Sequence, residues 1–316
     1  MVRNLFEWPG WTKLAAMTTT VAAIAALWFT SQSLRATDNQ YSLSQQVAVT
    51  GRFQNAVEAL TSDKIDIRLG GIYLLERLAK DSPADQETVF EVLSAFVRTH
   101  TTASACEIPT RNTPAPVDIF AVVTVINRRT GSGPLDLAKT CMSGMDLRKA
   151  NLTGSSFDSA NLTETVFYSA NLTDAWFNGA NITRGGFSFA NLTEADLGGT
   201  NLTGSFLNQA NLTDAWLGRA NLTDVFMEGA NLVGAGLIEA DLTGADLTSA
   251  NLTGAQLTGA NFTDADLTGA NLTGADLTGA NLTGVQLTDA NLTQVYYDDT
   301  TRWPVGYAPP NSRPNR

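Results

Sequence analysis

The sequence predicts a mainly β solenoid that follows a membrane-spanning helix and a small α-helical domain. Three observations predict this architecture. A five-residue repeat fills the second half of the 316-residue chain, helical patterns fill much of the first half, and an uncharged apolar stretch lies near the start. The chain divides accordingly into residues 1–35 with the membrane helix, 36–134 with a linker and the helical domain, 135–300 with the repeats, and a tail over 301–316.

The first segment contains a stretch long enough to cross a bilayer. Residues 14–34 carry no charged side chain, and about 20 apolar residues span the hydrocarbon core as a helix. Trp8, Trp11 and Trp28 near its ends suit the membrane interface. A cleaved signal peptide is the weaker alternative, because no small-residue cleavage site directly follows the apolar residues. We therefore expect a single-pass membrane protein.

The second segment has the apolar spacing of amphipathic helices. Residues 52–62, 65–82 and 84–100 place apolar side chains three and four positions apart, and residues 117–129 form a fourth candidate. These side chains are interpreted as the core of a small domain. His100, the single histidine, has no second metal-ligating residue beside it. No catalytic constellation is found, so we expect neither an enzyme nor a bound cofactor or metal.

The repeats have a large apolar residue, position i, every five residues from about Leu137 to Tyr297. In the 29 repeats centred on residues 152 to 292, position i is Leu in 22 and Phe in five, and position i−2 is Ala in 22. Residues two apart point to the same side of an extended chain, but a period of five fits neither a strand nor a helix. The chain must turn a corner in each repeat, and four repeats then close a square coil of twenty residues.

Asparagine follows its own, longer period in the repeats. Asn or Asp occupies position i−1 in every second repeat from Asn151 to Asn291, so these side chains form columns on two opposite faces. Hydrogen bonding along each column is the expected role. The 13 Asn-x-Thr triplets also match the glycosylation signal, but we reject that interpretation, because glycans on two whole faces would be too dense.

The segments TGRFQNAVEAL and LDLAKTCMSGMDLRKANLTG, with the repeats that follow, resemble the membrane-anchored pentapeptide-repeat proteins of actinobacteria. The resemblance covers roughly residues 20 to 305. It implies a right-handed quadrilateral β-helix, preceded by a helical segment to which the resemblance assigns no function. It also implies that the soluble region is cytoplasmic and that the N-terminus lies outside.

The two cysteines agree with that location. Cys106 and Cys141 lie in different segments without CxxC spacing, so we predict free thiols and no disulfide scaffold. One charge more precedes the predicted span than follows it, which scarcely determines its orientation.

The acidic charge of the chain belongs to its repeats. Residues 135–300 carry 19 acidic and five basic side chains, whereas residues 1–134 carry 12 of each. Direct nucleic-acid binding is not expected, because phosphates are bound by Lys and Arg. The resemblance raises one alternative, an acidic rod that mimics DNA and inhibits an enzyme such as gyrase. Asp and Glu on all four faces fit this alternative poorly.

The repeats between residues 155 and 239 depart from the consensus, and aromatic side chains there are predicted to point outward. One variable face carries Val166, Tyr168, Phe189, Phe206 and Phe226, and the opposite face carries Trp176 and Trp216. These seven residues are the candidate partner-binding residues. The alternatives are that they lie flat over the backbone or pack against the helical domain. An acidic column of Asp174, Glu194 and Asp214 is interpreted as solvated, with a shared calcium ion as the alternative.

These observations predict a non-enzymatic, membrane-anchored scaffold that binds an unidentified protein partner. The predicted membrane contact is residues 14–34, and a homodimer through the C-terminal end of the rod is a further alternative.

Overall fold

The computed structural model describes residues 46–101, 116–131 and 133–310, together with Thr30, Gln40 and Cys106. Residues 1–55 and 56–316 form two compact units. Within the part of the chain that is described, no helix is long and apolar enough to cross a membrane. The predicted span over residues 14–34 lies outside the described residues, apart from Thr30.

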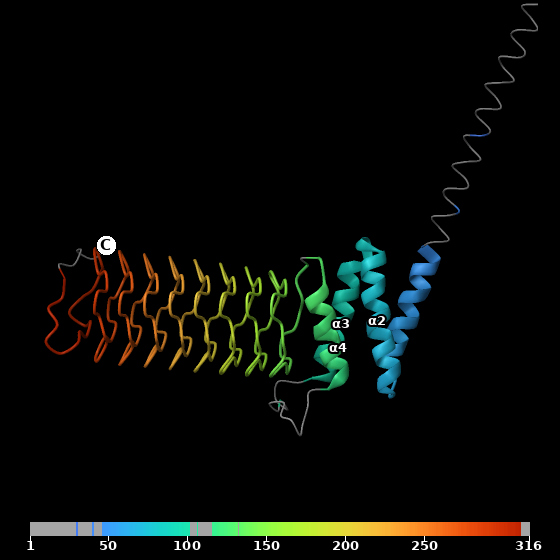
Figure 1. Cartoon of the computed structure of the whole chain (residues 1–316), viewed down its shortest axis with the longest axis horizontal. Coiled ribbons are helices and arrows are strands. Elements are labelled where there is room, and N and C mark those ends of the chain that lie inside the picture. Colours follow the sequence, from blue (N-terminus) through green and yellow to red (C-terminus); the bar gives the residue numbers. More distant parts are fainter. Residues whose placement is uncertain are drawn as a thin grey trace, which may run out of the picture. The chain divides into compact units, whose positions relative to one another are not determined.

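The first part of the larger unit is helical (Figure 1). Residues 46–60 are helical, and of these 46–55 belong to the smaller unit. They precede α2 (Ile65–Asp81), the short 3₁₀ turn η2 (Pro83–Asp85), α3 (Gln86–His100) and α4 (Val117–Arg128). All four predicted helices are present. Pro83 opens η2, where its missing N–H removes no helical hydrogen bond.

The helices bury a common apolar core. Leu75 of α2, Leu93 of α3 and Val122 of α4 are fully buried. The ion pair between Arg68 Nε and Asp118 Oδ2, 2.8 Å apart, ties α2 to α4 where Asp118 is only 5% exposed. Gly71 permits close packing, because a Cβ there would lie 2.8 Å from the carbonyl oxygen of Ala56.

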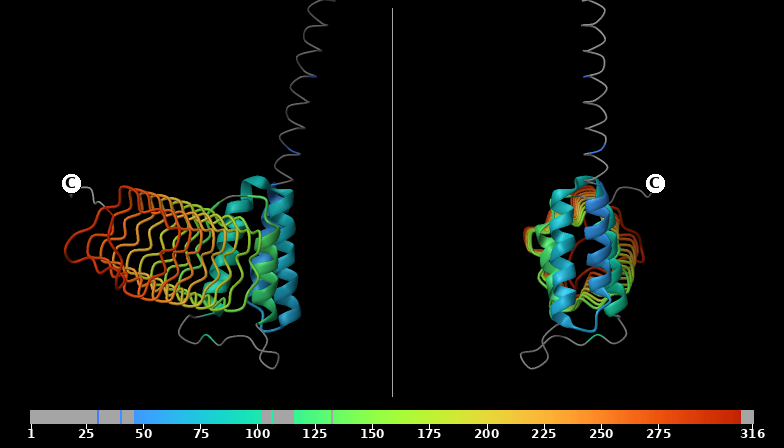
Figure 2. Two further views of the ribbon diagram at one scale, coloured as in Figure 1. Left: turned by 60° about the vertical axis from the view of Figure 1, so that its left-hand side comes forward. Right: turned by 90° about the vertical axis from the view of Figure 1, so that its right-hand side faces the viewer.

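The repeats form the predicted four-sided coil (Figures 1 and 2). Parallel bridges join residues twenty apart on each of four faces, beginning with Asp136 to Ser156, Cys141 to Asn161, Asp146 to Val166 and Asn151 to Asn171. Among the described residues the pairing takes the form of isolated bridges, with no extended strand. The reason is the five-residue period, since the chain turns a corner after each bridging residue.

The interior of the coil is filled as the sequence predicts. The residues at position i from Leu137 to Leu282 are fully buried, and the alanines at i−2 are at most 1% exposed as far as Ala280. Phe157 stacks on Phe177 at 4.9 Å, and Phe167 stacks on Phe187 at 4.8 Å. Large side chains require small neighbours, because a Cβ at Gly185 would lie 2.5 Å from Ile182 Cγ2 and 3.2 Å from Phe187 Cε2.

The asparagine columns are hydrogen-bonded ladders. Asn151 Oδ1 accepts a hydrogen bond from Thr153 Oγ1 at 2.9 Å, and Asn171 Nδ2 of the next coil donates to the same threonine oxygen at 2.9 Å. The pattern recurs along both columns, for example at Asn261 and Thr243. Asn and Thr therefore recur together because each links its coil to the next.

Each repeat turns its corner at position i+2, where the backbone adopts a positive φ. Glycine fills many of these corners, such as Gly254 at φ 67°. Others carry polar residues, such as Asp174 at 56° and Arg219 at 59°. Phe189, at 61°, is the aromatic residue among the described corners.

The helical domain caps the first coil on all four faces. Arg98 Nη1 donates to the carbonyl oxygen of Asp136, and Asn127 Nδ2 donates to that of Asp146 at 2.7 Å. Arg129 Nε donates to the carbonyl oxygen of Asn151 at 2.8 Å. On the remaining face, the backbone N–H of Cys141 donates to Thr101 Oγ1 at 3.3 Å. Each open edge of the coil thus has a side-chain partner in place of a preceding coil.

Arg129 makes further contacts at its cap. It also donates from Nη1 to the carbonyl oxygen of Gly133 at 2.7 Å and lies 5.6 Å from the ring centre of Phe90. Burial lowers the pKa of the guanidinium to about 10. The side chain therefore remains charged at neutral pH, and its hydrogen bonds offset the lost hydration.

The prediction of free thiols is wrong, because Cys106 and Cys141 form a disulfide. Cys106 follows α3, and Cys141 is the bridging residue of the first coil on the face that Thr101 caps. Capping brings the two cysteines together although 35 positions separate them. Sequence spacing alone carried no sign of this approach.

The last coil ends in an aromatic cluster. Arg302 makes a final bridge to Asn281, and Trp303 packs against Tyr297 at 5.2 Å and Tyr307 at 5.5 Å. A hydrogen bond from Thr300 holds the pKa of Asp298 below its usual range. The start of the predicted tail is therefore part of the rod.

Candidate functional site

The first candidate surface is an aromatic ladder on one face of the rod. Phe206 and Phe226 bridge successive coils, and their rings stack at 5.1 Å with planes 7° apart. They remain 44% and 41% exposed. A hydrocarbon surface held open in this way is uncommon on a protein that elsewhere presents Asn, Thr and Asp.

A second aromatic pair extends this surface toward the corner. Tyr168 and Phe189 meet edge to face at 5.5 Å, and both are exposed. Val166, half-buried, and Gly186 lie in the same bridging column as Phe206. The structure thus brings all five predicted residues of this face together, and we call Tyr168, Phe189, Phe206 and Phe226 the phenyl face.

Phe189 reaches the phenyl face at a conformational cost. A bulky side chain with φ near +60° clashes with its own backbone, which costs about 1 to 2 kcal/mol. The preceding coil has Ser169 at the equivalent corner and a later coil has Gly229. An aromatic ring at this corner is therefore unfavourable for folding, and its pairing with Tyr168 points to a role on the surface.

The opposite face carries the two tryptophans. Trp176 and Trp216 are 54% and 43% exposed, and each bridges to Asp196, which lies between them. Asp196 Oδ2 accepts a hydrogen bond from Asn178 Nδ2 at 3.0 Å. We call Trp176, Asn178, Asp196 and Trp216 the indole face.

The helical domain leaves both faces open. Its described contacts with the rod lie at the first coil, through Arg98, Thr101, Asn127 and Arg129. The interpretation that the helices pack over Phe206 and Phe226 is therefore wrong for the described residues. The flat placement also considered from the sequence applies to Trp216, which lies against the backbone of Gly218 and Gly236.

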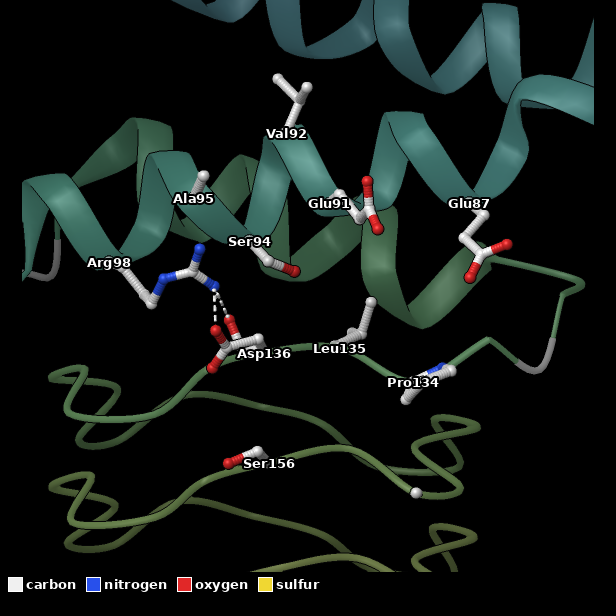
Figure 3. A pocket seen from close by; sticks show the side chains of 11 residues that line it. Glu87, Glu91, Val92, Ser94, Ala95, Arg98, Pro134, Leu135, Asp136 and Ser156 are labelled. Carbon is white, nitrogen blue, oxygen red and sulfur yellow. Dashed lines mark hydrogen bonds and ion pairs between the residues drawn. The ribbon is translucent and has the colours of Figure 1, made fainter.

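A cleft of about 620 Å³ separates α3 from the first coil (Figure 3). Its floor includes Leu135, and the ion pair between Arg98 Nη1 and Asp136 Oδ2, 2.9 Å apart, closes one end. Glu87 and Glu91 line the α3 side. Ser94 Oγ is buried there and has no hydrogen-bond partner among the described atoms. The described lining carries the carboxylates of Glu87, Glu91 and Asp136 and no histidine or lysine.

The acidic column and His100, the other candidates from the sequence, form no metal or catalytic site among the described residues. Asp174, Glu194 and Asp214 stand at equivalent corners of successive coils. No group of three or more His, Cys, Asp and Glu side chains within the described residues is arranged to hold a metal ion. His100 stacks on Phe96 at 4.0 Å, and its Nδ1 lies 2.9 Å from the carbonyl oxygen of that residue.

Sequence reasoning missed the capping residues, the disulfide, the α3 cleft and the glycine bed under Trp216. The last of these had a visible signal. Five glycines of the rod lie outside position i+2, namely Gly185, Gly186, Gly198, Gly218 and Gly236, and the last three approach Trp216.

Comparisons with known proteins place the repeats among similar sequences. The family model for pentapeptide repeats matches residues 146–184 and, in overlapping copies, 190–294. The crystal structure of HetL, a pentapeptide repeat protein involved in heterocyst differentiation regulation in the cyanobacterium Nostoc sp. strain PCC 7120, is 33% identical. That match covers 54% of this chain and 77% of HetL, with a TM-score of 0.34.

Two other solved structures are similar over shorter or more divergent stretches. Rfr23 from the cyanobacterium Cyanothece 51142 is 42% identical over 31% of this chain and 63% of its own, with a TM-score of 0.22. A trypsin-treated form of QnrB1, a plasmid-mediated fluoroquinolone resistance protein, is 18% identical over 49% of this chain and 88% of its own, with a TM-score of 0.27. A comparison with curated proteins found no significant match.

The family fixes the handedness of the coil, since pentapeptide repeats form right-handed quadrilateral β-helices. The twenty-residue register and the burial at i and i−2 recur along the rod, and the family model matches the repeats over residues 146–184 and 190–294. HetL, itself a pentapeptide repeat protein, is 33% identical over 77% of its length. The chain therefore belongs to the family of pentapeptide repeat proteins.

Proposed function

We propose that this pentapeptide repeat protein is a non-enzymatic, membrane-anchored scaffold that binds a protein partner through the phenyl face. The observation that carries the proposal is the stacked and exposed pair of Phe206 and Phe226. Aromatic side chains at the centre of an interface commonly supply much of its binding energy. The solid interior of the rod, with its leucines fully buried from Leu137 to Leu282, favours surface binding over chemistry on an enclosed substrate.

Rigidity supports the same proposal. Phe206 and Phe226 are fixed to adjacent coils by backbone hydrogen bonds from their amide nitrogens to Gly185 and Ser205. Their side chains already stack in the free protein. A partner therefore loses little binding energy in ordering this surface, which favours tight association.

The disulfide changes the proposed location of the rod. The cytoplasmic placement was supported by free thiols, and the bond between Cys106 and Cys141 removes that support. Structural disulfides persist mainly in oxidising compartments. We infer that residues 14–34 anchor the chain and that the rod faces the non-cytoplasmic side. Arg3 and Lys13 ahead of the span, against Arg35 after it, agree with a cytoplasmic N-terminus.

The location is tested on the disulfide itself. Cells are quenched in acid to stop thiol exchange, and the denatured protein is returned to neutral pH. It is then treated with a large maleimide reagent, with and without prior reduction, and its gel mobility is compared. A mobility shift that requires reduction supports the oxidising side. Complete modification without reduction would place the rod in the cytoplasm after all.

The partner is tested by capture from solubilised membranes with the full chain as bait. The double variant Phe206→Thr/Phe226→Thr should lose the partner and keep its fold, because neither side chain enters the interior. Gln256→Thr/Gln286→Thr is the control, since both glutamines are exposed at position i−1 of later repeats. Gln286 lies in the bridging column of Phe206 and Gln256 in that of Trp216. Equal capture by the wild type, the double variant and the control would refute the assignment.

The same capture experiment tests the remaining alternatives. A type II topoisomerase on the bait, with inhibition of supercoiling by the pure protein, would replace the scaffold by the DNA-mimic alternative. Self-association through the C-terminal end is measured by light scattering, where a mass twice that of the chain supports a dimer. Loss of that mass on removing residues 297–316 would place the contact at this end.

A further inference from the structure

We propose that the indole face binds an extended, uncharged β-linked glycan that runs along the axis of the rod. This inference concerns a different face from the phenyl face, so it stands or falls separately from the proposed protein partner. It depends on the spacing of the tryptophans, on how Trp216 is supported, and on the polar groups between the two rings.

The spacing matches a linear sugar chain. Trp176 pairs with Asp196, and Asp196 pairs with Trp216, so the two indoles stand two coils apart in one column. Two strand spacings amount to about 9.6 Å. An extended β-linked pyranose chain advances by close to one strand spacing per sugar. Every second sugar would therefore meet an indole, and the sugar between them would lie over Asp196.

Trp216 is supported so that one face of its ring is presented outward. A Cβ added to Gly218 or Gly236 would clash with the six-membered part of the indole, and a Cβ at Gly198 would lie 3.2 Å from Cδ1. Gly218 and Gly236 are themselves buried although they stand at outward positions. The indole thus lies flat against the backbone of glycine residues, which have no side chains to displace it. A flat aromatic face stacks well on the axial C–H face of an equatorially substituted pyranose.

The groups between the rings suit hydroxyl donors. Asp196 Oδ1 accepts from the backbone N–H of Gly198 at 3.0 Å, and Oδ2 accepts from Asn178 at 3.0 Å. Both oxygens are held in place and keep further lone pairs for a ligand. Covering this carboxylate with an apolar protein surface would leave a desolvated charge unpaired. Sugar hydroxyls instead supply the hydrogen bonds that it needs.

Charge selects among glycans. The rod is strongly acidic, and Asp158 lies one coil before Asn178 on this face, where its Oδ1 accepts the backbone N–H of Asn178 at 2.9 Å. Sulfated or uronic-acid chains would be repelled. A neutral chain with equatorial linkages, of the cellulose or chitin type, is the ligand that these residues fit.

The test measures binding of cellohexaose and chitohexaose to the full chain by titration calorimetry, with maltohexaose as the α-linked control. The protein is held in a detergent without a sugar headgroup, because alkyl glycosides would compete. At least one β-linked hexasaccharide should bind, and maltohexaose should not, because its curved chain cannot meet both rings. Trp176→Ala and Trp216→Ala should each weaken binding by about tenfold or more, the loss expected for one aromatic stack.

Three further variants separate stacking from a general loss of structure. Trp216→Phe should retain part of the affinity, Asp196→Asn should weaken it, and Phe206→Thr/Phe226→Thr should leave it unchanged. Circular dichroism checks that each variant keeps the fold. Failure of both β-linked sugars to bind at millimolar concentration would overturn the proposal. Equal binding by Trp176→Ala and Trp216→Ala, equal binding of maltohexaose, or capture of a protein that depends on both tryptophans would also overturn it.

Discussion

The coils between residues 155 and 239 and those between 241 and 294 share one backbone and differ in almost everything attached to it. Both halves repeat the same parallel bridges and the same Asn–Thr ladder. The first half contains four of the five buried phenylalanines, all five glycines outside position i+2, and both aromatic faces. The second half has alanine at every i−2 position except Val285. The near-consensus half therefore shows what the fold requires, and departures from it in the first half need another explanation.

The largest effect is expected when a charged side chain is placed in the interior of the coil, in either half. We call residues 241–294 the regular half and residues 155–239 the varied half. Leu252→Lys in the regular half and Leu222→Lys in the varied half each bury an unpaired ammonium group, since both leucines are fully buried. We expect each to lower the free energy of unfolding by about 4 kcal/mol or more. Thermal and denaturant unfolding measure the loss, with Asn251→Gln as the milder change outside the interior. A lysine variant that unfolds like the wild type would show that position i does not point inward.

The disulfide should have the next largest effect, and only on the end that adjoins the varied half. A cross-link between residues 35 apart restricts the unfolded chain by about 4 kcal/mol in the loop-entropy model. Cys106→Ser/Cys141→Ser should therefore unfold at a lower temperature than the oxidised wild type. The single variant Cys106→Ser should match the double one, and a reducing agent should bring the wild type to the same value. If reduction leaves the unfolding temperature unchanged, the bond does not stabilise the cap.

The fold, including the twenty-residue register, could be predicted from the sequence, because the same apolar and asparagine positions recur in every coil. The inward position of Leu252 and the columns that contain Asn251 follow from spacing alone. The cap could not be predicted, because Arg98, Thr101, Asn127 and Arg129 follow no period and meet the first coil only after the helices pack. The disulfide was missed for the same reason. The outward direction of Phe206 and Phe226 was predictable, whereas the support of Trp216 required seeing which glycines lie beneath it.

Removing one capping residue should cost less stability, and the effect should be confined to the end of the rod next to the helical domain. Arg129→Ala removes hydrogen bonds to the carbonyl oxygens of Asn151 and Gly133, and we expect a loss of about 2 kcal/mol. Amide hydrogen exchange should rise most in the first coil and least near residues 241–294, because each coil contacts only its neighbours. Arg148→Ala is the control, since its exposed pairing with Asp146 is screened by water and should leave exchange unchanged. Uniform faster exchange along the rod would contradict the nearest-neighbour explanation.

The smallest expected effect is an increase in the free energy of unfolding. It tests whether aromatic residues on the surface of the varied half lower its stability. Phe189 holds a left-handed corner at φ 61°, a conformation that glycine adopts without strain. Phe189→Gly should therefore raise the free energy of unfolding by up to about 1 kcal/mol, after the lost contact with Tyr168 is subtracted. Ser169→Gly, at the equivalent corner of the preceding coil, should change it less, because serine is smaller and keeps no ring contact. In the capture experiment Phe189→Gly should bind less partner although it is the more stable protein. A variant that is less stable than the wild type would mean that the ring is retained for packing, and the difference between the two halves would then reflect folding after all.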